Sequence, residues 1–233
     1  MLNKIKIIGR AYPIEQKNFE ENKEPVTYFS LSVPSPSGVI TTLRCGAWGE
    51  IAERIKNEIQ KDDIVEVSGY LRNEKSGLQI LVRVLKFTKL GINFEEIDNK
   101  IANQVRLLGK IVTDFRLRSD SDKNKEIISF KITVPREGIK SPLFFCRAHG
   151  ELILEVTNQL KKGDIVLWEG FLQTGKIIEI QENNEERRRY ISAVICQGFT
   201  YLDNDFVDTF SYLSELKHIT RTIKEIDFTK PRE

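Results

Sequence analysis

Residues 61–71 read Lys-Asp-Asp-Ile-Val-Glu-Val-Ser-Gly-Tyr-Leu, and residues 162–172 read Lys-Gly-Asp-Ile-Val-Leu-Trp-Glu-Gly-Phe-Leu. The two stretches share a register in which Gly69 matches Gly170. Apolar residues fall at every second position in the first stretch, which is typical of a strand with one buried face. A strand of this kind that occurs twice predicts an internal repeat.

The repeat extends over most of the chain. Further matching blocks, in the same order, are Ile5–Arg10 with Val105–Lys110, Phe29–Pro34 with Phe130–Pro135, and Leu43–Glu50 with Phe144–Glu151. The last two blocks and the opening one keep a constant spacing of about 101 residues, which indicates a duplication. Two copies are too few for a solenoid, so each copy is expected to fold as its own domain.

The order of elements within each copy predicts the fold. Three strand patterns precede a segment in which the apolar spacing becomes helical, and two strand patterns follow it. The helical positions are Ile51, Ile55 and Ile59 in copy one and Leu152, Val156 and Leu160 in copy two. A helix between the third and fourth of five strands is the order of the OB fold. The sequence therefore predicts an all-β protein with short helices, built from two tandem OB-fold five-stranded barrels plus a C-terminal helical segment.

The domain boundaries follow from this repeat. We expect a first OB domain over residues 1–90, a linker over 91–102, a second OB domain over 103–202, and a helical segment and tail over 203–233. An apolar stripe that begins with Phe206 and Phe210 indicates the helix. Two roles stay open for this segment, namely docking on its own barrel or binding a partner.

Length and composition limit the class of protein. The chain has 233 residues, a formal net charge of +2, and 40% hydrophobic and 30% charged residues, which suits soluble globular domains. No apolar run approaches the roughly 20 residues that a membrane helix needs, and no secretory signal is recognisable. We expect no membrane association, and a location in the bacterial cytoplasm or the interior of an organelle. The small net charge means that a nucleic-acid partner must be argued from the positions of the charges.

Metal and catalytic motifs are missing from the sequence. Three cysteines (Cys45, Cys146 and Cys196) form no CxxC pair, and there are only two histidines, so we expect reduced core cysteines and no metal site. The phosphate-binding glycine loops and the common hydrolase motifs do not occur. We expect no enzyme activity and no cofactor.

Three motifs of copy one carry a family resemblance. These are the Asn-led first strand Asn3–Gly9, the helix opening Ala47-Trp48-Gly49-Glu50-Ile51-Ala52-Glu53, and the fourth strand Asp63–Leu71. They resemble the bacterial and organellar single-stranded-DNA-binding protein family. The resemblance implies OB barrels, binding of single strands through aromatic and basic residues, and assembly to four OB units, hence a homodimer of this chain. Copy two keeps His149-Gly150-Glu151 but loses the Ala-Glu that follows.

Strand alternation and the resemblance together select candidate nucleic-acid contacts. They are Arg10, Arg44, Trp48, Tyr70 and Arg72 in copy one, Lys110, Phe145, Arg147, His149 and Phe171 in copy two, and Arg187, Arg188 and Arg189 in its last hairpin. Arg83 is a further basic residue of copy one that could follow a phosphate backbone. Aromatic rings stack on bases, and arginine follows the phosphate backbone.

Each of these assignments has an alternative. Trp48 can pack against its own helix, and Tyr70 and Phe171 can pack under a loop or against the other barrel. The triple arginine follows several glutamates, so it can also be a solvated hairpin tip.

Two functions from different classes follow. The first is sequence-nonspecific binding of single-stranded DNA, or of RNA, in DNA replication, recombination or repair. The alternative is a scaffold subunit, similar to the single-strand binding family or of the primosomal type, that works through protein contacts in a larger replication, transcription or ribosomal assembly. The near-neutral charge and the scarcity of stacking candidates in copy two favour the alternative.

Overall fold

The structure is a computed structural model that describes residues 2–12, 15–18, 24–74, 79–120, 125–135, 141–180 and 186–202. For residues 15–18, 119–120, 125, 176–180 and 186–189 only the backbone is described. The predicted C-terminal helical segment, residues 203–233, lies outside the described residues.

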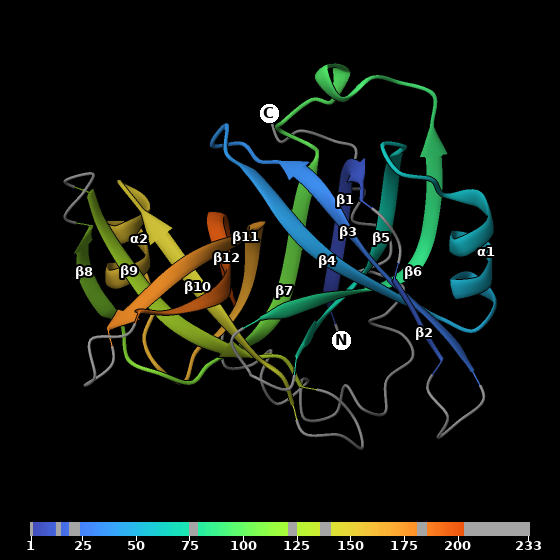
Figure 1. The fold of residues 1–233 in the computed structure, drawn as a ribbon. Helices are drawn as coiled ribbons and strands as arrows, with labels where there is room; N and C mark the ends of the chain where they lie inside the picture. The colour runs from blue at the N-terminus through green and yellow to red at the C-terminus, as the bar shows by residue number, and fades with distance from the viewer. Residues whose placement is uncertain are drawn as a thin grey trace.

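Two sets of strands follow each other along the chain (Figure 1). The first set is β1 (Asn3–Ala11), β2 (Glu15–Asn18), β3 (Pro25–Pro34), β4 (Ile40–Trp48), α1 (Glu50–Glu58), β5 (Ile64–Asn73) and β6 (Ile80–Leu90). A 3-10 turn, η1 (Phe94–Glu96), lies in the connection. The second set is β7 (Asn103–Ile111), β8 (Arg116–Asp120), β9 (Lys125–Thr133), β10 (Leu143–His149), α2 (Leu152–Gln159), β11 (Ile165–Ile180) and β12 (Glu186–Leu202).

Each set closes into a five-stranded barrel, as the OB prediction requires. In the first, β3, β4, β6, β5 and β1 are neighbours in that order, and β1 pairs back with β3. In the second, β9, β10, β12, β11 and β7 are closed by the pairing of β7 with β9. The sequence analysis missed the short strands β2 and β8, which add to the outside of the two barrels at β3 and β9. In β8 the described side chains Arg116, Leu117 and Arg118 are exposed, so no buried apolar pattern marks this strand.

The two barrels share one continuous sheet through β1 and β7. These strands run antiparallel, and Ile5 pairs with its own repeat equivalent, Val105. Asn3 pairs with Leu107, and Ile7 pairs with Asn103. The same patch of each barrel thus meets its equivalent about a local two-fold axis, the isologous contact that usually joins two subunits.

An asparagine at the start of each barrel fixes this central sheet. The Asn3 side chain donates to the Leu71 carbonyl at 3.0 Å and accepts from the Leu71 amide at 2.9 Å. Asn103 repeats the exchange with Leu172, at 2.8 and 2.9 Å. A side-chain amide that satisfies both the backbone N–H and the backbone C=O of one residue extends the ladder by one position.

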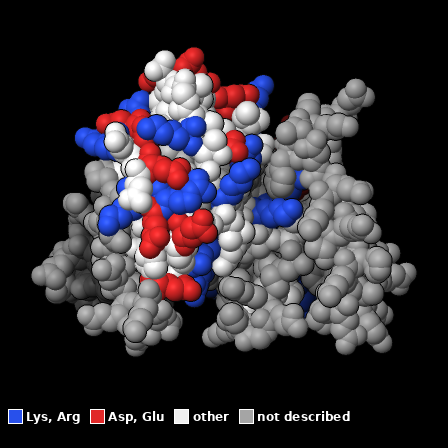
Figure 2. Space-filling view, turned by 90° about the vertical axis from the view of Figure 1, so that its right-hand side faces the viewer, with Lys and Arg blue, Asp and Glu red and all other residues white. Residues whose placement is uncertain are grey.

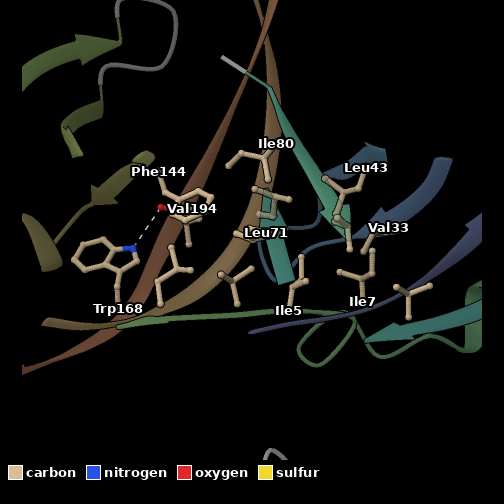
Figure 3. Packing of buried hydrophobic residues seen from close by; sticks show 14 of the residues in the cluster. Ile5, Ile7, Val33, Leu43, Leu71, Ile80, Phe144, Trp168 and Val194 are labelled. Atoms are coloured by element: carbon tan, nitrogen blue, oxygen red, sulfur yellow. Dashed lines mark hydrogen bonds between the residues drawn. The ribbon is translucent and has the colours of Figure 1, made fainter. Parts of the chain in front are cut away.

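The interior of the barrels forms one apolar cluster, part of which Figure 3 shows. Trp168 is 0% exposed, which confirms the prediction that it is a core residue. Its indole nitrogen donates to the Val194 carbonyl at 3.4 Å, and its ring meets Phe130 edge-on at 5.0 Å. The buried indole N–H of Trp168 therefore has a hydrogen-bond partner, as is usual for a buried tryptophan.

The last β-hairpin of each barrel depends on a glycine. A Cβ at Gly69 would lie 1.9 Å from the Arg83 carbonyl oxygen, and a Cβ at Gly170 would lie 1.8 Å from that of Ile195. The register of the strand pair shifts next to each of these glycines. The bulge lets the long strands bend around the barrel, and it places Arg83 on the outer face of barrel 1.

Candidate nucleic-acid interface

Alternation along β4 separates core from surface as the sequence analysis predicts. Leu43, Cys45 and Ala47 are at most 1% exposed, and the same holds for the equivalent residues of β10. Arg44 and Trp48 therefore point away from the core. Burial raises the pKa of the Cys45 and Cys146 thiols above their ordinary value, so these groups stay neutral in the barrel.

Four strands of barrel 1 bring one row of residues into line. Tyr28 on β3 pairs with Gly46 on β4, Gly46 pairs with Arg83 on β6, and Arg83 pairs with Tyr70 on β5. A second row runs beside it from Ser30 through Arg44 and Leu81 to Arg72. We call the set Tyr28, Arg44, Trp48, Tyr70, Arg72 and Arg83 the barrel 1 face.

Trp48 is held between a cation and a second ring. The guanidinium carbon of Arg83 lies 3.5 Å from the centre of the Trp48 ring. Tyr28 meets Trp48 edge-on, with ring centres 5.7 Å apart and planes at 78°. Gly46 makes room for both rings, because a Cβ there would lie 2.9 Å from the Trp48 ring and 3.1 Å from that of Tyr28. These contacts lie across the strands.

Arg44 connects the two rows of the barrel 1 face. Its guanidinium carbon is 5.0 Å from the centre of the Tyr28 ring, and one of its nitrogens is 2.6 Å from the Glu74 carboxylate. The Arg44 side chain remains 44% exposed, whereas that of Glu74 is 19% exposed. A cation in this position is preorganised over an aromatic ring and still open to a ligand.

Arg83 is the most desolvated cation of the barrel 1 face. Burial and the nearby charge of Arg72 lower the pKa of its guanidinium, with burial as the larger cause. Arginine stays charged at neutral pH even so. Among the described residues, the buried Arg83 Nε has no hydrogen-bond partner. A buried N–H without a partner costs about 1–3 kcal/mol, so stability alone does not account for an arginine here.

The equivalent face of barrel 2 has a different chemistry. The row that matches Tyr28, Gly46, Arg83 and Tyr70 is Ser129, Arg147, Ile195 and Phe171. Phe171 is 5% exposed and packs with Ala193, Ile195 and the half-buried Phe145. The Phe171 ring is thus enclosed by apolar neighbours of its own barrel, and its stacking on a base stays a prediction.

Other predicted contacts are dispersed. Arg10 lies over the Phe94 ring at 4.6 Å and pairs with Glu95 at 3.5 Å, so it holds the connection between the barrels and is not on the barrel 1 face. Lys110 is exposed at the equivalent place on β7. His149 and Arg147 are half-buried on β10. Arg187, Arg188 and Arg189 pair with β11 along the last hairpin, and their side chains lie outside the described residues.

Tyr28 completes the barrel 1 face, and the sequence analysis did not name it as a contact. Arg83 was named as a basic residue that could follow the phosphate backbone, but its contact with Trp48 was not expected. The sequence feature that could have identified Tyr28 as a surface residue of this face is its outward position in the alternation of β3. Nothing local to β6 indicates that Arg83 meets Trp48, because this contact depends on the parallel pairing of β4 with β6.

The charges on the side of the molecule that carries α1 are mixed. Figure 2 shows Lys and Arg interspersed with Asp and Glu on that side. Within α1 itself, Arg54 pairs with Glu58 at 2.9 Å. The described residues of this side therefore form no extended positive patch of the kind that usually accompanies nucleic-acid binding.

Two features were searched for in the part of the chain that the structure describes, namely a metal-binding cluster and a membrane-spanning helix. No group of three or more His, Cys, Asp or Glu side chains is arranged to hold a metal ion there. Within the same residues, no helix is long and apolar enough to span a bilayer.

Residues 102–201 match the model of the single-strand binding protein family. This match covers the second barrel. Barrel 1 repeats its strand order and its closure, so the chain has two OB barrels in tandem. No curated protein matches the sequence of this chain.

Solved structures of a single-stranded DNA binding protein are similar to this chain in fold. The wild-type single-stranded DNA binding protein from Thermus aquaticus is 19% identical, with a TM-score of 0.64, over 87% of this chain and 93% of that chain. A deletion mutant of the same protein is 22% identical, with a TM-score of 0.65, over 87% of this chain and 95% of that chain. At this level of identity the likeness shows the fold, and it extends over both barrels.

Proposed function

We propose that this protein binds single-stranded DNA without reading its sequence, in DNA replication, recombination or repair. The observation that carries the proposal is the barrel 1 face, where Arg83 lies over Trp48 and Arg44 lies over Tyr28. Bases stack on aromatic rings whatever their identity, and arginines attract the phosphates between them. The fold supports the proposal as well, because structures with this fold are named as single-stranded DNA binding proteins.

The binding role is non-enzymatic in this proposal. The barrel 1 face offers rings and guanidinium groups, which hold a ligand without transferring a proton or attacking a bond. The division into domains at residues 1–90 and 103–202, with the linker 91–102, belongs to the same proposal. So does a homodimer with four OB units, in the bacterial cytoplasm or an organelle.

A low-salt gel shift tests the proposal. A labelled dT strand is mixed with the full chain, and unlabelled single-stranded DNA, single-stranded RNA and duplex DNA compete in separate lanes. We expect a shifted band that single-stranded DNA removes at the lowest concentration and that duplex DNA leaves in place. Absence of any shift at low salt would reject the proposal, and full competition by the duplex would reject its preference for single strands.

A scaffold function is the second candidate, and the face of barrel 2 favours it. Phe145, Phe171 and Ile195 stand where barrel 1 has Arg44, Tyr70 and Arg83. Apolar residues in these places suit packing rather than contact with phosphate. The scaffold would be supported if the protein bound no single strand at low salt and purified as a stable part of a larger complex.

A further inference from the structure

The strand β8 lies at one end of the continuous sheet, beside β9 (Figure 1). Among the described strands it pairs with β9 alone. The edge of β8 that faces away from β9 therefore presents backbone N–H and C=O groups that no described strand satisfies. An edge of this kind is a template to which an extended peptide can add as a further strand.

The side chains of β8 combine positive charge with an apolar contact. Arg116 and Arg118 are exposed, and Leu117 between them is 59% exposed. Alternation places the two arginines on one side of the strand and Leu117 on the other. Within the described part of the chain neither guanidinium has an ion pair. The nearby Asp114 is already paired with Lys162 at 3.7 Å, so the centre of β8 stays positive.

The matching strand of barrel 1 lacks this combination. β2 reads Glu-Gln-Lys over residues 15–17, where β8 reads Arg-Leu-Arg over residues 116–118. Both strands pair with their neighbours in the same register, at the 101-residue spacing of the repeat. Barrel 1 thus forms the same strand pair without the arginines or the leucine, so the architecture of the barrel does not account for them.

The charges of β8 select the chemistry of a partner. A second copy of β8 would bring arginines against arginines, and like charges opposite each other destabilise a strand pair. Carboxylates at every second position of an extended peptide recur at about 6.7 Å, which is the spacing of Arg116 and Arg118 along β8. An apolar residue between two such carboxylates falls on the side of Leu117. The edge therefore fits an extended peptide of acidic and apolar residues in alternation.

Nucleic acid fits this edge less well than an acidic peptide. The phosphates of a single strand carry the right charge, but β8 (Arg116–Asp120) contains no aromatic residue on which a base could stack. A single strand also leaves the free backbone groups of the edge without the ladder of partners that a peptide supplies.

We propose that the outer edge of β8 binds an acidic segment of another protein, which adds to the sheet as an extended strand. Arg116 and Arg118 pair with its carboxylates, and Leu117 contacts an apolar residue between them. This protein-binding site belongs to barrel 2 and is separate from the barrel 1 face. The inference goes beyond the proposed function, and it gives the divergence of the two edge strands a physical reason.

A short acidic peptide tests the inference on the full chain. The probe is Ser-Glu-Val-Glu-Val-Glu-Ser with blocked ends, titrated to about 1 mM into isotope-labelled protein while the amide NMR signals are followed. We expect saturable shifts in β8 and β9, none in β2 and β3, and nuclear Overhauser contacts between the backbones of the probe and β8. The same peptide with Lys in place of Glu should produce no shifts.

The repeat supplies matched variants for this titration. The edge of barrel 2 receives the residues of β2 in the triple variant Arg116→Glu, Leu117→Gln, Arg118→Lys. The edge of barrel 1 receives the residues of β8 in the triple variant Glu15→Arg, Gln16→Leu, Lys17→Arg. We expect the first variant to bind the probe about tenfold more weakly, the size of three lost cross-strand pairs. The second should gain shifts in β2 and β3. Each new stretch already occurs in the other barrel, so both variants should fold.

Three results would overturn the inference. The first is a wild type without shifts in β8, or a first variant that binds the probe as well as the wild type does. The second is weaker dT binding by the first variant at 0.15 M salt, where charges more than about 8 Å apart are screened, since it would assign the arginines to nucleic acid. The third is a wild-type dimer that the first variant converts to a monomer, since it would assign the edge to a second copy. The proposed function is tested separately, by wild-type binding of dT.

Discussion

The guanidinium carbon of Arg83 lies 3.5 Å from the centre of the Trp48 ring, although 35 residues separate the two in sequence. The contact joins β4 to β6 across a parallel strand pair of barrel 1. It fixes a cation next to the ring that is expected to stack on a base. The barrel 1 face therefore combines charge and stacking at one point rather than in separate patches.

Substitutions of Arg83 should separate these two contributions. Arg83→Lys keeps the charge but loses the planar stacking on Trp48, and we expect about 1 kcal/mol weaker binding of a short dT strand. Arg83→Ala should weaken binding further and reduce the slope of log affinity against log salt by about one phosphate contact. Anisotropy titrations at several salt concentrations measure both quantities.

Arg54 supplies the control for this pair of variants. Its guanidinium also lies over an aromatic ring, Phe87, at 5.0 Å, but it belongs to α1. Arg54→Ala should leave both affinity and salt slope unchanged. Equal effects of Arg54→Ala and Arg83→Ala would show that loss of any surface cation explains the result.

Removal of the Glu74 charge should strengthen binding. The 2.6 Å ion pair with Glu74 competes with a phosphate for Arg44, so Glu74→Gln is expected to tighten dT binding by about two- to fivefold and to steepen its salt dependence. Glu58→Gln, which frees Arg54 on α1 in the same way, should have no effect. A loss of affinity in Glu74→Gln would mean that Glu74 positions Arg44 for binding.

The asparagines of the central sheet should differ in their contribution to stability. Each of Asn3→Ala and Asn103→Ala removes two hydrogen bonds, but Asn103 is 0% exposed and Asn3 is half-buried. We expect urea unfolding to show a loss of about 1–3 kcal/mol, larger for Asn103, where water cannot replace the missing partner. Asn158→Ala, on the exposed side of α2, should cost nothing measurable. A reversed order of the two core variants would contradict the account.

The two bulge glycines should separate folding from binding. A Cβ at Gly69 would collide with the Arg83 carbonyl oxygen, so Gly69→Ala should lower stability by about 1–3 kcal/mol and also weaken short-strand binding by displacing Arg83. Gly170→Ala makes the equivalent collision in barrel 2 and should lower stability with little effect on the short strand. Gly91→Ala, where a Cβ has open space, is the control. Equal losses of short-strand affinity in Gly69→Ala and Gly170→Ala would argue against barrel 1 as the first binding site.

The fold was predictable from the sequence because buried residues recur with the side-chain period of each strand and helix. Alternation along the strands of 61–71 and 162–172 marks the core side of each barrel, and Trp168 followed from its match with Val67. The surroundings of outward-facing residues are less predictable, since strand alternation does not show which side chains cover them. Tyr70 and Phe171 occupy matching outward places, yet Phe171 is enclosed by Ala193 and Ile195.

Contacts between distant strands were the part that the sequence could not supply. The place of Arg83 over Trp48 depends on which strand β6 joins and on the bulge at Gly69. Arg10 contacts Phe94 and Glu95 because the connection between the barrels folds back over it. Register and tertiary packing decide such contacts, and neither is encoded in one strand pattern.

Intrinsic fluorescence tests the central claim most directly, because the chain has two tryptophans in opposite environments. Trp48 is half-exposed on the barrel 1 face, and Trp168 is 0% exposed in the core. We predict that dT strands quench the emission of the wild type and of Trp168→Phe, and that Trp48→Phe shows no quench. Binding that leaves the wild-type emission unchanged, or a quench that persists in Trp48→Phe, would contradict the assignment of the barrel 1 face as the binding site.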